Sequence, residues 1–483
     1  MFLPRLTICA LSLAGTLALA DDAAIRPLVE YVQAHRDGEA PWSVDFAKLG
    51  GERAALPIGV FDSGIGGLTV MDAILQLDAF HNDTLQPGAD GRPDFAGERF
   101  VYFGDQANMP YGNYPSQGSE DFLRELIVKD AVFLLGDRWR KTPAGTLRRD
   151  KPPVKAIVIA CNTATAYGIE DIRAALAAWK LDVPVIGVIE AGARATAAAL
   201  PDDGRAHGVA VLATVGTCAS GAYPKSIGRA TGMAGKSAPV VVQQGSAGLA
   251  GAIEGNRAFV TKDADGGARA VPYQGPAPDP ALLPAYRFEP SGLLGNPAQL
   301  NSVPNYARYD VTTLLETHRQ KGGPPIDTVV LGCTHFPLAK TELAEAFRLA
   351  RTYEAVDGSH PYADIVAGEV QFIDPAQSTA RELFRELART RLRAKGPGAD
   401  EAPRCEFFFS VPNPQANGIP LAADGSLENA YKTSRAVGNF ATEDTVAIPL
   451  TADTLPESSA PLVRSLSAVW RQMQAAPATA GQR

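Results

Sequence analysis

Short apolar runs alternate with amphipathic segments along most of the chain. Helical patterns follow several of the runs, for example at 67–77, 121–135 and 163–179. Continuous apolar strands, rather than alternating ones, are typical of parallel sheets that helices cover on both faces. The pattern therefore predicts an α/β, doubly wound fold. The predicted strands are 56–61, 99–103, 154–160, 183–189, 208–213, 238–243, 327–332 and 369–374.

The alternation repeats in two halves. In the first half, VFDSGIGG follows a strand and VIACNTAT comes later; in the second, VLATVGT follows a strand and VLGCTHFP comes later. Each half thus has a turn after its opening strand and a later strand that ends in Cys. We expect two similar doubly wound parallel-sheet domains, 56–188 plus 370–455 and 189–369, with the active site at their interface.

Other segments do not fit this alternation. The stretch 257–307 is rich in Gly, Pro, Ala and Asn, and it indicates an insertion made of loop. Shorter insertions are expected at 82–97 and 140–153. A polar, Ala-rich extension precedes the first domain at 21–55, and a frayed C-terminal tail is expected at 456–483.

The N-terminus carries the pattern of a secretory signal peptide. Arg5 precedes an apolar stretch, and Ala18-Leu19-Ala20 comes directly before two acidic residues. A membrane anchor or a buried helix is the alternative, but the apolar stretch is short for a membrane span. We expect cleavage after Ala20, export, and a periplasmic location in a Gram-negative source, with no membrane insertion of the mature protein.

Composition and cysteine spacing exclude several classes. The formal net charge is -8, whereas a nucleic-acid surface needs a basic stripe. The chain has 5 cysteines at wide spacings, which form neither a disulfide framework nor a zinc motif. Cys218 and Cys405 are assigned to packing.

Cys161 and Cys333 occupy equivalent positions in the two halves. Each lies just after an apolar strand, where open α/β sheets bind ligands. A helix N-terminus follows each thiol, and such a terminus binds carboxylates and stabilises thiolates. A lone cysteine at the end of a strand is most often structural. Two cysteines placed alike favour a joint chemical role.

Paired thiols suit the racemisation of an amino acid. The reaction removes the Cα proton and returns one to the opposite face, so a base and an acid must flank the carbon. A thiol has an ordinary pKa of about 8.5, which lets it serve in either role near neutrality.

Other candidate residues lie in short polar motifs. Asp62 and Ser63 precede a glycine-rich turn, where they either bind an ammonium group or cap a helix. Tyr111 and Gly112 in PYGNY either donate backbone N–H groups to a carboxylate or form an ordinary loop. His335 either orients the neighbouring thiol or caps backbone groups.

Seven motifs in order resemble glutamate racemase, of the aspartate/glutamate racemase superfamily. They are FDSGIGGLTV, VYFGDQANMPYG, IVIACNTATA, VPVIGVIEAGA, TVGTCASGAY, DTVVLGCTHFPL and FIDPAQSTA, and they span about Pro57 to Ala380. The resemblance implies no cofactor, an amino-acid substrate, a homodimer, and a role in supplying D-glutamate for peptidoglycan. It implies Cys161 and Cys333 as acid/base thiols, with Asp62, His335 and Glu254 assisting. It implies substrate contacts from Asp62, Ser63, Tyr111, Gly112, Asn162, Thr163, Thr334 and His335.

The chain departs from this family in ways that leave alternatives open. Family members are shorter and cytosolic, and VQQGSAGLAG stands where they usually have Cys-Pro. One alternative is a racemase for aspartate or for several amino acids that acts outside the cytoplasm. Another is an exported protein that binds an amino acid without turning it over.

Overall fold

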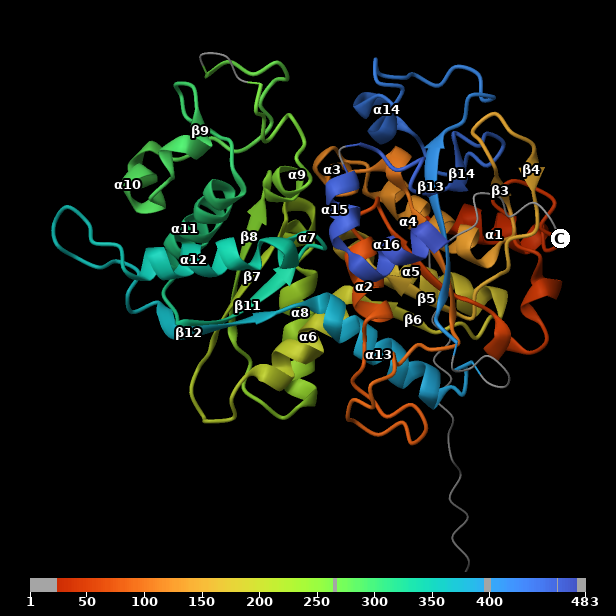
Figure 1. Ribbon diagram of the computed structural model, residues 1–483, viewed down its shortest axis with the longest axis horizontal. Helices are drawn as coiled ribbons and strands as arrows, with labels where there is room; N and C mark the ends of the chain where they lie inside the picture. Colours follow the sequence, from red (N-terminus) through yellow and green to blue (C-terminus); the bar gives the residue numbers. More distant parts are fainter. Residues whose placement is uncertain (1–23, 264–266, 395–400, 458, 476–483) are drawn as a thin grey trace, which may run out of the picture.

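The computed structural model describes residues 24–263, 267–394, 401–457 and 459–475. Over these residues the chain forms two α/β halves that lie side by side, each built on its own sheet (Figure 1). The expected signal peptide lies outside the described residues. No described helix is both long enough and apolar enough to cross a membrane.

The first sheet has the strand order β14-β13-β2-β1-β5-β6, and its neighbouring strands are parallel except for the pair β13–β14. Every residue of β1 is buried, as the continuous apolar run predicts for a central parallel strand. The strands are β1 (Ile58–Asp62), β2 (Arg99–Gly104), β5 (Ala156–Ile159), β6 (Val185–Gly187), β13 (Arg404–Pro412) and β14 (Thr445–Pro449).

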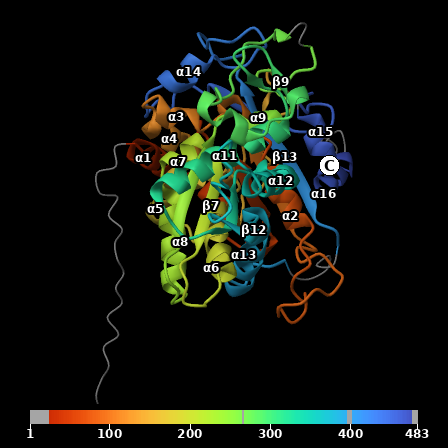
Figure 2. The ribbon, with the colours of Figure 1, turned by 90° about the vertical axis from the view of Figure 1, so that its left-hand side faces the viewer.

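The second sheet has the order β12-β11-β7-β8, and all of its strands are parallel. Figure 2 turns this half toward the viewer. Its strands are β7 (Gly208–Thr214), β8 (Val240–Ser246), β11 (Ile326–Gly332) and β12 (Val366–Ile373). Two short hairpins stand outside both sheets, formed by β3 (Trp139–Arg140) with β4 (Leu147–Arg148), and by β9 (Leu293–Leu294) with β10 (Gln299–Leu300).

The two halves share one strand order. β2-β1-β5-β6 in the first sheet corresponds to β8-β7-β11-β12 in the second, with the first strand of each half between the second and third. The strand order of each half reverses at its first strand, which is where doubly wound sheets bind ligands. The predicted fold class is confirmed. Cys161 and Cys333 follow the third strand of each half.

Helices cover both faces of each sheet, and a separate apolar cluster fills each of the four layers. α13 packs against α2 of the first half and against α6, which leads into the second, so it joins the two halves. The helices on the first half are α1 (Arg26–Ala34), α2 (Leu68–Leu75), α3 (Asn113–Ser116), α4 (Glu120–Leu135), α5 (Asn162–Trp179), α13 (Pro375–Arg389), α14 (Asn429–Ser434), α15 (Ala460–Ser465) and α16 (Ser467–Ala475). Those on the second half are α6 (Val188–Ala199), α7 (Val215–Ala219), α8 (Ala222–Met233), α9 (Leu249–Ile253), α10 (Leu283–Tyr286), α11 (Val303–Lys321) and α12 (Lys340–Arg351).

The domain boundary expected at residue 370 is displaced by a few residues. Thr328 pairs with Gln371 and Val330 with Ile373, so β12 belongs to the second sheet to its end. The chain returns to the first half at Asp374, which caps α13 by accepting the backbone N–H of Ala376. Strand pairing, rather than the apolar run itself, decides to which sheet this strand belongs.

The expected frayed tail at 456–483 is wrong over its described part. α15 and α16 bury Val463, Val469 and Met473 against the first half. The carboxylate of Asp72 accepts the backbone N–H groups of Ala468 and Val469, which fixes the start of α16 on α2. The small, polar composition of the tail concealed one apolar helix face.

The structure adds detail to one further expectation and corrects another. The polar extension at 21–55 contains α1, and Trp179 of α5 donates its indole N–H to the backbone oxygen of Val29, so the extension packs against the first half. The expected loop insertion at 257–307 contains α10 and the β9–β10 hairpin, and it ends earlier, because α11 begins at Val303.

Replacement of Val469 by alanine tests the packing of α16. Removing two buried methyl groups should lower the free energy of unfolding by about 2 kcal/mol. Arg471→Ala, which changes an exposed side chain on the same helix, should leave it nearly unchanged. Urea denaturation followed by circular dichroism measures both values. Equal stability of the Val469→Ala variant and the wild type would show that α16 is not packed as described.

Candidate active site

The turn after β1 is organised around the carboxyl group of Asp62. One of its oxygens accepts the backbone N–H groups of Gly64 and Gly67, at 3.2 and 2.9 Å. A Cβ at Gly67 would overlap the Asp62 side chain, so this tight turn requires glycine. Burial raises the pKa of Asp62, and the two backbone hydrogen bonds oppose that rise.

Cys161 begins the helix that follows β5. Its sulfur accepts the backbone N–H of Ala164 at 3.3 Å and lies 3.5 Å from the hydroxyl oxygen of Ser63. Burial, and then the neighbouring charge of Asp62, raise the pKa of the Cys161 thiol to about 12. The helix N-terminus acts in the opposite direction but does not overcome burial. This cysteine is therefore held as a neutral thiol.

Cys333 follows β11 and has a different environment. Its sulfur lies 3.8 Å from Nδ1 of His335, and Nε2 of the same ring lies 2.8 Å from a carboxylate oxygen of Glu254. The imidazole thus connects a thiol on one side to a carboxylate on the other. Glu254 immediately follows α9, so this relay is assembled from two loops of the second half.

The relay favours a positive charge on His335. Burial lowers the pKa of His335, but hydrogen bonds to Cys333 and Glu254 more than offset it and raise the pKa well above 6.5. An imidazolium beside a sulfur favours the thiolate by charge attraction. The two cysteines, equivalent in topology, are therefore unequal in electrostatics.

Contacts between the halves place the loops that carry the two thiols against each other. A Cβ at Gly66 would overlap the ring of His335, so the turn beside Asp62 lies directly against the Cys333 loop. The hydroxyl of Thr69 donates to the backbone oxygen of Thr334 at 3.0 Å. The charge of His335 also acts on the pKa of Asp62, which contacts Cys161.

Two more side-chain pairs cross the interface. The hydroxyl of Tyr223 donates to the amide oxygen of Asn162 at 2.7 Å. Thr163 and Thr217 share a hydroxyl hydrogen bond at 3.1 Å. A small cavity at the interface has both Asn162 and Cys333 in its wall. The loops at the carboxyl ends of the two sheets therefore meet, and the small cavity between them is lined by Cys333 and by Asn162, the neighbour of Cys161.

Tyr111 has a structural side chain. Its hydroxyl lies 2.6 Å from Asp105 and 2.8 Å from Asp130, and all three groups are buried. One hydroxyl proton cannot serve two carboxylates. Burial, and then the charge of Asp105, raise the pKa of Asp130 well above its ordinary value, so Asp130 keeps its proton and donates it to Tyr111. The network leaves only the backbone of Tyr111 and Gly112 for a ligand.

The C-terminal part of the chain holds this loop in place. Ser410 of β13 donates to Asp105 at 2.7 Å and accepts the backbone N–H of Ala107 at 2.9 Å. Lys432 of α14 donates to the backbone oxygen of Met109 at 2.7 Å. Both residues lie beyond Ala380, where the motif resemblance ends. The loop is thus supported from a region that the motifs do not cover.

The structure thus brings most of the expected site residues to the interface. Their roles in catalysis and binding stay predictions. Sequence reasoning missed the interface residues Thr69, Thr217 and Tyr223. Thr217 lies in the VLATVGT motif that follows the opening strand of the second half, and this motif could have signalled it. The described cysteines are all free; Cys405 is buried on β13, and Cys218 is partly buried on α7.

The chain is similar to known racemases in sequence. Residues 139–271 match the family model described as Asp/Glu/Hydantoin racemase. A glutamate racemase of Limosilactobacillus fermentum is 36% identical over 290 residues, which cover 60% of this chain and 72% of that protein. A glutamate racemase of Geobacter metallireducens is 28% identical over 332 residues, or 69% of this chain and 80% of that protein.

Solved structures give more distant matches. A glutamate racemase isoform of Bacillus anthracis is 23% identical with a TM-score of 0.44, and the match covers 73% of this chain and 88% of that one. A glutamate racemase of Francisella tularensis, solved with D-glutamate, is 23% identical with a TM-score of 0.43, over 73% of this chain and 88% of that one.

The fold, the site and the family model together define the class. Two α/β halves that each place a thiol at the carboxyl edge of a parallel sheet form an amino-acid racemase of the Asp/Glu type. Within this class, the chain belongs to the glutamate racemase family.

Replacement of Glu254 by glutamine tests the relay through its pH dependence. The imidazolium of His335 persists up to its raised pKa, and activity that needs it falls as pH rises through that value. Without the Glu254 carboxylate the pKa of His335 falls, so the alkaline decline of kcat/KM should move to lower pH. Steady-state kinetics across neutral and alkaline pH measure the shift. Glu345→Gln, at a half-exposed position of α12, should leave the profile unchanged, and a wild-type profile for Glu254→Gln would contradict the relay.

Proposed function

We propose that the protein interconverts L- and D-glutamate by a two-thiol acid/base mechanism, with Cys161 and Cys333 on opposite faces of the substrate Cα. The observation that carries this proposal is the placement of two equivalent cysteines at one interface in opposite electrostatic settings. Cys161 is held as a neutral thiol beside Asp62, whereas Cys333 faces the imidazolium of His335. One base and one acid are what the reaction needs.

Each turnover moves protons between sulfur and carbon. In one direction the thiolate of Cys333 takes the Cα proton and becomes a thiol, while the thiol of Cys161 gives its proton to the opposite face and becomes a thiolate. The reverse direction starts from the other enantiomer with the roles exchanged. Asp62, which contacts Cys161, and the Glu254–His335 pair at Cys333 are placed to adjust these protonation states.

Negative charge that develops on the substrate during proton removal needs donors. Backbone N–H groups at a helix start and hydroxyls are suited to a carboxylate, and a carbanion is stabilised through that carboxylate. On the Cys161 side these groups come from Asn162 and Thr163. On the Cys333 side Thr334 and the His335 imidazolium supply them. Ser63 lies beside the Cys161 sulfur.

A racemase for aspartate or for several amino acids is the second candidate. The departure that favours it is the segment VQQGSAGLAG, which lies on β8 and α9 shortly before Glu254. Comparison of kcat/KM for glutamate and aspartate separates the two candidates.

The variants Cys161→Ser and Cys333→Ser test the mechanism. A serine hydroxyl is a far weaker acid than a thiol, so each variant should lose racemisation by at least about a hundredfold. Polarimetry with L-glutamate and with D-glutamate measures the rates. In D₂O each variant should still exchange the Cα hydrogen of only the enantiomer that faces the remaining thiol, as NMR would show.

Cys405→Ser is the matched control, because Cys405 is buried in β13 away from the interface, and it should keep full activity. Full racemisation by either active-site variant would defeat the two-thiol assignment. Binding of glutamate by the wild type without Cα exchange would instead support a protein that only binds the amino acid.

We also infer that the protein is exported and that it acts as a homodimer. Export is supported by the sequence of Met1–Ala20, and the dimer by the resemblance to the family. A Gram-negative host that expresses the full chain should release it from the periplasm with Asp21 as its first residue. Mass spectrometry of the released protein measures this. Recovery of the uncleaved chain from the cytoplasm would refute the prediction.

A further inference from the structure

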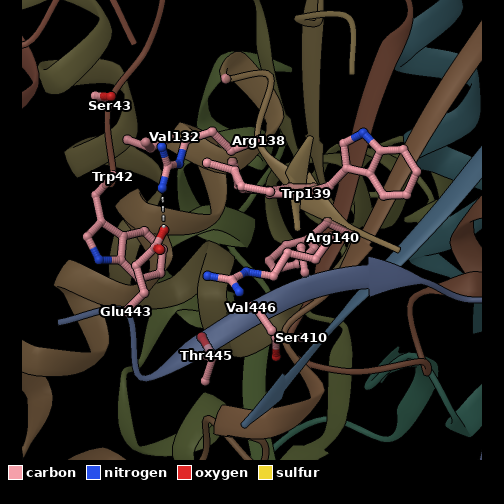
Figure 3. A pocket seen from close by; sticks show the side chains of 15 residues that line it. Trp42, Ser43, Val132, Arg138, Trp139, Arg140, Ser410, Glu443, Thr445 and Val446 are labelled. Carbon is pink, nitrogen blue, oxygen red and sulfur yellow. Dashed lines mark hydrogen bonds and ion pairs between the residues drawn. The ribbon is translucent and has the colours of Figure 1, made fainter. Parts of the chain in front are cut away.

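A second cavity lies in the first half, away from the thiols. It is bounded by the N-terminal extension, α4, the β3–β4 hairpin and the start of β14 (Figure 3). Most of these walls lie outside the parts of the chain that carry the catalytic motifs. Of the residues described at the active site, Ser410, which supports the Asp105 loop, lines this cavity, whereas neither thiol does.

Aromatic and aliphatic side chains form most of the wall. Trp42 comes from the extension, Phe103 from β2, Phe133 from α4 and Trp139 from the hairpin. Flat aromatic walls favour a flat apolar ligand, because rings gain both burial and stacking there. The body of a ligand for this cavity is therefore an aromatic ring.

The polar groups of the wall are mainly donors. Arg138 is paired with Glu443 at 3.1 Å, which neutralises that carboxylate. Arg140 forms hydrogen bonds only to neutral oxygens of Gly145 and Gln415 and has no carboxylate partner among the described residues. Within the described part of the chain, its positive charge is therefore not paired with a carboxylate.

Two further N–H groups at this cavity lack partners. The indole nitrogen of Trp42 and Nε of Arg138 are buried and have no hydrogen-bond acceptor within the described residues. A buried donor without an acceptor costs about 1–3 kcal/mol. A hydrogen-bond acceptor on a ligand would remove this penalty, and a carboxylate would also pair with the charge of Arg140.

The size of the cavity limits the ligand. Its volume of about 70 Å³ is roughly half that of an enclosed cavity of about 150 Å³ that takes up benzene, so at most one ring enters it and the rest of the ligand stays in solvent. A nucleotide is too large for such a space.

We propose that this cavity is a second binding site, which takes a small single-ring aromatic carboxylate. The ring packs between Trp42 and Trp139, and the carboxylate lies toward Arg140. The proposal is independent of the reaction at the thiols.

Isothermal titration of the full-length protein with phenylacetate tests the proposal. Phenylacetate should bind, and the neutral isostere phenylacetamide should bind at least about tenfold more weakly, because it cannot pair with Arg140. Saturating glutamate should leave the affinity for phenylacetate unchanged. This comparison requires no variant, and it does not depend on whether the protein racemises glutamate.

Arg140→Gln should weaken phenylacetate binding by at least about tenfold. Arg348→Gln is the matched control, since Arg348 pairs with Glu345 on α12 of the second half and does not line the cavity. Thermal melting checks that both variants fold. The proposal is overturned if no binding is detected, if phenylacetamide binds equally well, if Arg140→Gln binds as the wild type does, or if glutamate displaces the probe.

Discussion

The contact between the β1 turn and the Cys333 loop is the constraint on which the site depends. Gly66 lies against the ring of His335, and no larger residue fits there. The turn that holds Asp62 beside Cys161 is therefore also the surface that meets His335 and Thr334. Through this contact both halves contribute to one site. Side-chain pairs such as Tyr223 with Asn162 also hold the carboxyl edges of the two sheets together.

The two halves have the same strand order but differ in the charged groups beside their thiols. Both thiols follow the third strand of a four-strand unit with the same order. One has a carboxyl group as its neighbour and the other has an imidazole with its own carboxylate partner. Duplicated topology places the two sulfurs equivalently, and their unequal partners give them different surroundings. A reaction that needs an acid opposite a base uses this difference.

The segments outside the two repeated four-strand units support the site but contribute no thiol to it. β13 extends the first sheet parallel to β2. Ser410 therefore lies near the carboxyl end of the parallel strands, where it donates a hydrogen bond to Asp105. Lys432 fixes the loop at Met109. The N-terminal extension packs behind α5 through Val29 and Trp179, and it also contributes Trp42 to the second cavity. These additions enlarge the first half and support its loops.

Local sequence determined the central strands, the helices that follow them and the two thiol positions, because apolar runs and strand-end motifs depend on near neighbours in the chain. It also indicated the repeat that pairs Cys161 with Cys333. Tertiary structure alone decided the rest. The assignment of β12 to the second sheet depends on its pairing with β11. The packing of α16 depends on Asp72, nearly 400 residues away, and the charge on His335 depends on Glu254. Hydrogen bonds and burial between distant segments set these features, and no local pattern records them.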